Sequence, residues 1–74
     1  MTTEYDHSFG KKLRSYRMSC KFTQDEFSHE LMRSGCDLSR HDISEIENGK
    51  RYIYPHELKS ICYVLDIALE ELMP

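Results

Sequence analysis

The sequence lacks the features that mark membrane proteins and disulfide-stabilised secreted proteins. No apolar run approaches the roughly 20 residues that a membrane-spanning helix needs, and the polar first ten residues show no secretory signal peptide. The three cysteines, Cys20, Cys36 and Cys62, are odd in number and widely spaced. This spacing argues against a disulfide framework and against a Cys-x-x-Cys zinc site. We therefore expect reduced thiols, no metal or other cofactor, and a cytoplasmic protein.

Net positive charge is also missing. The chain has 10 lysines and arginines against 13 aspartates and glutamates, which gives a formal net charge of -3. A nucleic-acid binder that relies on electrostatics alone is usually basic, so the composition argues against that class. The objection is limited, because salt screens exposed charges beyond about 8 Å and the charges on the contacting face matter most.

Strand patterning, internal repeats and a second domain are absent as well. With 74 residues, of which 39% are hydrophobic, the chain is long enough for one small all-α domain. We expect a loose polar tail over residues 1–7 and a domain over residues 8–74. The first helix is expected to be capped at its start by Asp6 or Ser8 and to bury an apolar stripe. Further helices are predicted at 23–34, 39–48, 55–65 and 69–73.

The segment from Ser39 to Arg51 contains the best-marked helix of the chain. Ser39 fits an N-cap, and Gly49 fits a C-terminal stop. Ile43 and Ile46 fall on one side of this helix and must hold it against a core, because so short a helix is unstable alone. The opposite side can form hydrogen bonds throughout and is predicted to face DNA. It consists of Arg40, His41, Ser44, Glu45 and Asn48.

Three segments in this order resemble the Cro/phage-repressor (Xre-like) helix-turn-helix family. They are Phe22–Phe27, Ile43–Lys50 and Leu65–Leu72. The resemblance implies a compact five-helix lambda-repressor-like domain, in which the helices at 23–34 and 39–48 form the helix-turn-helix. The connector between them, around residues 32–37, is longer than is usual in the family. We therefore expect an extended connector, whose geometry the sequence leaves open.

The resemblance also implies roles for individual residues. The helix at 39–48 would enter the major groove of double-stranded DNA, where arginine can bridge guanine O6 and N7 and glutamate can accept from cytosine N4. The residues implied to contact bases are Arg40, His41, Ser44 and Glu45. The residues implied to contact phosphate are Gln24, Ser39, Asn48, Lys50 and Arg51. Arg17 is implied to form a structural ion pair with Glu47.

These features lead us to expect a sequence-specific DNA-binding transcriptional regulator that acts as a repressor. It would bind as a homodimer through the last helix, whose Leu69, Leu72 and Met73 could otherwise close the core, and would associate with the nucleoid. The alternative is a protein-binding module or antitoxin on the same fold, which the net charge favours. Against it, the outward side of the helix at 39–48 lacks the aromatic anchors typical of protein hot spots. An enzyme is not expected, because nothing places an orienting group or oxyanion site beside a cysteine–histidine pair.

Overall fold

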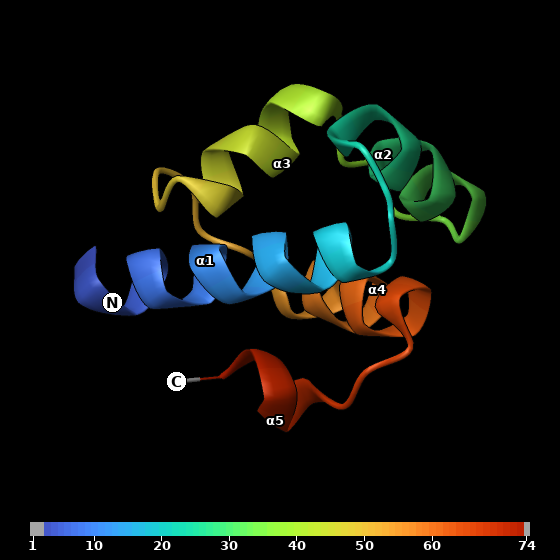
Figure 1. Cartoon of the computed structure of the whole chain (residues 1–74). Coiled ribbons are helices and arrows are strands. Elements are labelled where there is room, and N and C mark those ends of the chain that lie inside the picture. Colours follow the sequence, from blue (N-terminus) through green and yellow to red (C-terminus); the bar gives the residue numbers. More distant parts are fainter. Residues whose placement is uncertain (1–2, 74) are drawn as a thin grey trace.

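The structure, a computed structural model, describes residues 3–73, with the side chains of residues 3–7 excepted. These residues form five helices and no strand, which confirms the all-α, five-helix expectation (Figure 1). The helices are α1 Thr3–Ser19, α2 Gln24–Arg33, α3 Arg40–Glu47, α4 Pro55–Leu65 and α5 Leu69–Leu72. The start predicted for the first helix, Asp6 or Ser8, is wrong, because α1 begins at Thr3. Residues 1 and 2 of the expected tail lie outside the described residues.

The longest helix, α1, runs through the middle of the domain (Figure 1). It contacts α3 on one side and α5 on the other, while α2 contacts both α3 and α4. No helix within residues 3–73 is long and apolar enough to cross a membrane. Since α3 rests against α1 and α2, its remaining side is left at the surface.

Four of the helices begin with the same kind of cap. A backbone N–H just before the helix donates to a carboxylate three residues later, which satisfies one of the donors left unpaired at a helix start. The carboxylates are those of Glu26, Asp42, Glu57 and Glu71, at 2.8–3.0 Å. In α2 and α3 the capping hydroxyl also accepts an N–H, at 3.0 Å for Thr23 and 3.1 Å for Ser39. The caps that the sequence predicted at these two residues are therefore confirmed.

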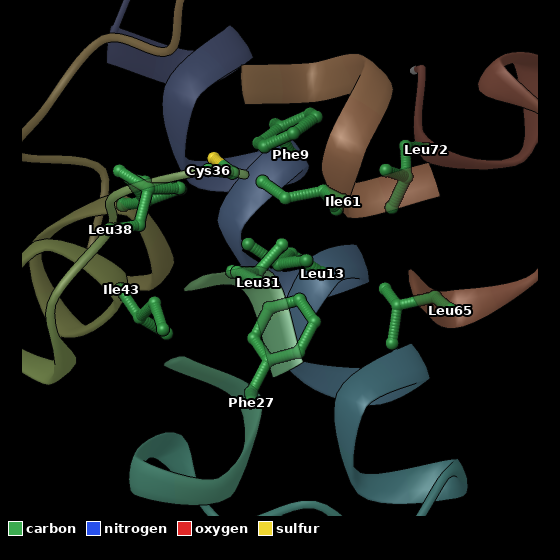
Figure 2. Close-up of a cluster of buried hydrophobic side chains, with 11 residues drawn as sticks. Phe9, Leu13, Phe27, Leu31, Cys36, Leu38, Ile43, Ile61, Leu65 and Leu72 are labelled. Atoms are coloured by element: carbon green, nitrogen blue, oxygen red, sulfur yellow. The ribbon is translucent and has the colours of Figure 1, made fainter. Parts of the chain in front are cut away.

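The hydrophobic core receives side chains from all five helices and from the connector between α2 and α3 (Figure 2). Leu13, Phe27, Leu31 and Ile61 are completely buried there, and burying each such side chain contributes about 1.5–3 kcal/mol. The short α5 packs against α1 and α4 through Leu72, which is also completely buried. Of the three residues expected on a dimer surface, Leu72 therefore belongs to the core of the single chain.

The connector between α2 and α3 is extended and packed against the core. It turns at Gly35, whose φ of +92° lies in the left-handed region that favours glycine. Beyond it, Cys36 and Leu38 are buried. The Cys36 N–H donates to the Leu31 carbonyl at 2.8 Å, and the Ser28 hydroxyl donates to the Leu38 carbonyl at 2.6 Å. Two buried side chains and two hydrogen bonds to α2 thus determine the geometry that the sequence left open.

Candidate nucleic-acid interface

The helix α3 has one buried side and one polar side. Ile43 and Ile46 are 0% and 2% exposed, so they hold the helix against the core as the sequence predicted. The side predicted to face DNA lies at the surface of the domain. Its exposed members are Arg40, His41 and Asn48, and its half-buried members are Ser44 and Glu45.

Some groups on this polar side already have partners within the helix. His41 Nε2 lies 3.5 Å from Glu45 Oε2, one turn along α3, so a protonated His41 forms an ion pair with Glu45. Asn48 Nδ2 donates to the Ser44 carbonyl at 2.8 Å. Arg40, in contrast, forms no ion pair within the described part of the chain. Arg40 is therefore available to an external acceptor.

The residues predicted to contact phosphate differ in how free they are. Lys50 is exposed and has no ion pair among residues 8–73. The Ser39 hydroxyl is used within the cap, since it accepts from the Asp42 N–H at 3.1 Å and donates to Asp42 Oδ2 at 3.0 Å. The Gln24 amide, at the start of α2, donates to Glu47 Oε1 at 3.2 Å. Lys50 is thus the freest of these groups, while Ser39 and Gln24 also hold the helices in place.

The last turn of α3 is tied to α1 by the predicted partners Arg17 and Glu47. Arg17 Nε lies 2.6 Å from Glu47 Oε2, and Arg17 Nη2 lies 3.1 Å from Glu47 Oε1. The third nitrogen, Nη1, donates to the Phe22 carbonyl at 2.7 Å. Both side chains are almost fully buried, at 9% and 4% exposure. The structure thus brings together the pair that the resemblance implied, and it uses all three nitrogens of the guanidinium inside the protein.

The first turn of α3 is tied to α4 by a second arginine, Arg51. Its Nη1 and Nη2 lie 3.0 and 3.1 Å from the two carboxylate oxygens of Glu57, and its Nε lies 3.7 Å from Asp42 Oδ1. Nη1 also donates to the Tyr52 carbonyl at 2.9 Å. The residue predicted to contact phosphate therefore lies in a junction of two carboxylates. Sequence reasoning missed Glu57, although its place in the first turn behind Pro55 was a signal of a helix-capping carboxylate.

The charges in this junction stabilise one another. Burial raises the pKa of the Glu57 carboxyl, but hydrogen bonds from Arg51 and from the Tyr54 N–H outweigh burial, so that the pKa lies below its ordinary value. The hydrogen bond from the Ser39 N–H lowers the pKa of Asp42. Glu57 raises the pKa of Arg51. All three groups therefore stay charged near neutral pH.

The backbones of α1 and α3 touch at Gly10. A Cβ atom at this position would lie 2.4 Å from the Glu47 carbonyl oxygen and 2.7 Å from that of Ile46, closer than real Cβ contacts. Only glycine allows the two helices to approach this closely. Sequence reasoning missed this residue, and the available signal was a glycine inside a predicted helix.

The cysteines are free and differ in exposure. Cys20 is exposed, Cys36 is buried and Cys62 is half-buried. Burial raises the pKa of the Cys36 and Cys62 thiols, which makes them weak nucleophiles. In the described part of the chain, no group of histidine, cysteine, aspartate and glutamate side chains could hold a metal ion.

Known proteins are similar to this chain in sequence or in fold. A helix-turn-helix domain family matches residues 10–74. The control protein C.BamHI of Bacillus amyloliquefaciens is 32% identical over 73 residues, which cover 99% of this chain and 85% of that protein. The crystal structure of the DNA-binding domain of BldD has a TM-score of 0.85 at 22% identity, over 100% of both chains. The restriction-modification controller protein C.AhdI from Aeromonas hydrophila has a TM-score of 0.83 at 22% identity, over 96% of both chains.

The fold and the polar helix therefore define a helix-turn-helix protein. The chain belongs to the helix-turn-helix domain family, in its Xre-like (Cro/phage-repressor) branch, which consists of DNA-binding transcription regulators. The two solved structures, at 22% identity, establish the fold. The family that the three sequence segments resembled is thereby confirmed.

Proposed function

We propose that this chain is a sequence-specific transcriptional regulator that inserts α3 into the major groove of double-stranded DNA. The observation that carries the proposal is the orientation of α3. Its apolar side is buried through Ile43 and Ile46, and its hydrogen-bonding side lies at the surface. The major groove admits an α-helix and presents a distinct donor and acceptor pattern for each base pair, so this surface has the shape and the chemistry for reading sequence.

Base reading is assigned to Arg40, His41, Ser44 and Glu45. Arg40 is exposed in the first turn and has no ion pair to break among the side chains of residues 8–73, so it can bridge guanine O6 and N7. His41 and Glu45 lie one turn apart with 3.5 Å between Nε2 and Oε2. One of them can donate while the other accepts, for example from cytosine N4. The Ser44 hydroxyl can serve either a base or a phosphate.

Phosphate binding is assigned to groups at the edges of this surface. Lys50 is exposed just beyond α3, and Asn48 is exposed at its C-cap. Gln24 and Ser39 mark the starts of α2 and α3, whose backbone N–H groups carry partial positive charge and bind phosphate. These groups set the position of the protein on the duplex, while α3 supplies the sequence preference.

The net charge of -3 opposes this function less than it first suggests. Glu47 and Glu57 are buried and paired with Arg17 and Arg51. Each pair uses one positive and one negative charge and leaves the net charge at -3, but it keeps these two carboxylates away from the surface proposed to face DNA. Other carboxylates, such as Glu26, accept backbone N–H groups at helix starts. The surface of α3 therefore repels phosphate less than the composition implies.

The functional unit is proposed to be a homodimer. A single reading helix specifies few base pairs, whereas two copies on half-sites about 34 Å apart multiply the specificity. The contact is placed at α5, where Leu69 is 45% exposed and Met73 is half-buried. A dimer bound over a promoter would block the polymerase, so repression is the proposed effect. The name of the relative C.BamHI, a control protein, supports a regulatory role.

Fluorescence anisotropy tests this proposal with a duplex from the region that flanks the chain's own coding sequence. Arg40→Ala should weaken binding to that duplex by about 1–3 kcal/mol and relax the preference at one base pair. Lys50→Ala should weaken binding to every duplex alike and reduce the salt slope by about 1. A scrambled duplex of equal length is the control for specificity.

The second candidate is a protein-binding module or antitoxin on the same fold, and the observation that favours it is the net charge of -3. The same titration separates the two candidates. A DNA-binding regulator loses affinity steeply as salt rises, because phosphate contacts release counterions. Absence of binding, or binding that salt does not change, would favour the protein-binding module and remove the DNA-binding proposal.

A further inference from the structure

The first turn of α3 holds Arg40 and His41, yet the connector supports it from one side only. On that side, the Leu38 carbonyl accepts a hydrogen bond from Ser28 of α2. On the other side, the first turn is approached by Arg51, which follows α3 in the sequence and folds back to lie 3.7 Å from Asp42. Besides the buried Ile43, the position of the base-reading residues therefore depends on what holds Arg51.

Arg51 is itself held rigidly. Both oxygens of Glu57 lie within 3.1 Å of its two terminal nitrogens, and the Tyr52 carbonyl accepts from Nη1 at 2.9 Å. Glu57 is only 6% exposed, so it cannot turn toward solvent or DNA. Three of the five guanidinium N–H groups form hydrogen bonds inside the protein, and a fourth, at Nε, faces Asp42 at 3.7 Å, which leaves little donor capacity for a phosphate.

The two carboxylates that Arg51 joins are both helix caps. Asp42 accepts the Ser39 N–H at the start of α3, at 3.0 Å. Glu57 accepts the Tyr54 N–H at the start of α4, also at 3.0 Å. One arginine thus links the first turns of two helices, of which α3 carries the reading residues and α4 is anchored in the core through Ile61.

We infer that Arg51 is a positioning residue for DNA recognition, which acts through Glu57 and Asp42 to fix the first turn of α3 and makes no phosphate contact of its own. The inference rests on the proposed function. It revises the role that the sequence gave to Arg51, and it separates this residue from its neighbour Lys50. Side chains that read bases keep their positions only when neighbouring hydrogen bonds hold the helix that carries them. The Arg51 junction supplies such bonds on the side of the first turn that the connector does not contact.

The experiment compares five variants with the wild-type chain, the fifth being the conservative substitution Arg51→Lys. Arg51→Gln and Glu57→Gln each remove one charge of the junction, and the double variant removes both and so keeps the net charge at -3. Lys50→Ala is the matched control for a phosphate contact. Affinity is measured for the flanking duplex and for a scrambled duplex at four salt concentrations, at a temperature where circular dichroism finds every variant folded.

The three junction variants should lose affinity for the flanking duplex by about tenfold or more, the cost of one mismatched base pair. Their salt slopes, and the affinity of the double variant for the scrambled duplex, should match the wild type. Lys50→Ala should instead lose affinity for both duplexes and lose about 0.9 from the salt slope. Arg51→Lys should restore only part of the specificity, because an ammonium group cannot form the bidentate contact.

Two results would overturn the inference alone, and a third would remove it together with the proposed function. In the first, Arg51→Gln loses affinity for both duplexes and salt slope, as Lys50→Ala does, while Glu57→Gln binds as tightly as the wild type. Arg51 would then contact phosphate, because releasing its guanidinium from Glu57 would not weaken such a contact. In the second, the double variant is as specific for the flanking duplex as the wild type. The net charge of the chain, and not the position of the first turn of α3, would then explain the losses in the single variants. A wild-type chain that binds neither duplex would remove the proposed function, and this inference with it.

Discussion

The two ends of α3 are held by the same chemistry in different surroundings. At the last turn, Arg17 and Glu47 are 9% and 4% exposed. At the first turn, Arg51 and Asp42 are 24% and 31% exposed, although Glu57 behind them is buried. Arginine pairs with carboxylate at both ends, but the pair at the last turn is almost fully buried and the pair at the first turn is partly exposed to solvent. Partial access to water weakens an ion pair and lowers the cost of losing it.

This difference in burial gives the two ends of α3 different roles in stability and in DNA recognition. The last turn also touches the backbone of α1 at Gly10, so it is the fixed end of the helix. The first turn is positioned by side chains, among them buried Ile43 and the Arg51 junction, so it is the end that a side-chain substitution can shift. The residues proposed to read bases begin at this adjustable end. Substitutions at the last turn should therefore cost stability, and substitutions at the first turn should cost specificity.

The largest effect is expected from Arg17→Met, which leaves the buried Glu47 without an ion-pair partner and with the Gln24 amide as its remaining side-chain donor. An uncompensated buried carboxylate costs about 3–5 kcal/mol, and each kcal/mol lowers the Tm of so small a domain by about 4–8 °C. Thermal unfolding followed by circular dichroism measures the change. The double variant Arg17→Met with Glu47→Leu is the control and should be more stable than the single variant. An unchanged Tm for Arg17→Met would remove the contrast between the two ends.

A smaller loss is expected from Gly10→Ala. The new methyl group would push α3 away from α1, and such overpacking costs about 1–3 kcal/mol, which the higher helix propensity of alanine offsets by roughly 1 kcal/mol. Urea unfolding measures the difference. Ser15→Ala lies on the exposed side of the same helix and should leave stability nearly unchanged. If Gly10→Ala were as stable as Ser15→Ala, the close contact between the two backbones would be disproved.

Glu57→Gln tests the junction at the first turn of α3 through the pH dependence of the free energy of unfolding. Glu57 and Asp42 have folded pKa values below their ordinary 4.5 and 3.8, so they stabilise the fold above those values and lose that contribution as pH falls through the lowered pKa. We expect the variant to lose about 1–2 kcal/mol at pH 7 and to differ less from the wild type at pH 3. Equal losses at pH 7 and pH 3 would show that the carboxylate charge of Glu57 contributes nothing.

The smallest effect concerns Cys36, which lies in the connector beside the first turn. Its thiol is buried, and burial raises its pKa, so a thiol reagent should modify exposed Cys20 first. Arg51→Gln should speed the modification of Cys36, because the thiol reacts only when the surrounding structure opens. Arg17→Met, tested at a temperature where it is folded, should speed it less. Mass spectrometry of the labelled peptides measures both rates, and the reverse order would contradict the assignment of the two ends.

The features that the sequence predicted correctly depend on residues close together in the chain. The caps at Thr23 and Ser39 need only a carboxylate three residues later. The burial of Ile43 and Ile46 follows from their spacing on one helix. Local chemistry of this kind can be read from the order of the residues alone.

The features that the sequence did not predict depend on packing between distant segments. The role of Gly10 appears only when α1 meets the carbonyl of Glu47. The family resemblance implies a phosphate contact for Arg51, whereas its pairing with Asp42 requires the chain to fold back past the whole of α3. The start of α1 at Thr3 was missed because a polar segment has no apolar period to mark it as helical.

The most direct test of the account is an NMR titration of the uniformly labelled chain with the flanking duplex. The account predicts that the largest changes in amide shifts occur at residues 40–45, with further changes at Gln24, Asn48 and Lys50. The amides of α4 on the far side, around Tyr63, should change little. Changes centred on α4 or α5, with residues 40–45 unaffected by DNA, would contradict the claim that the polar side of α3 is the DNA-binding surface.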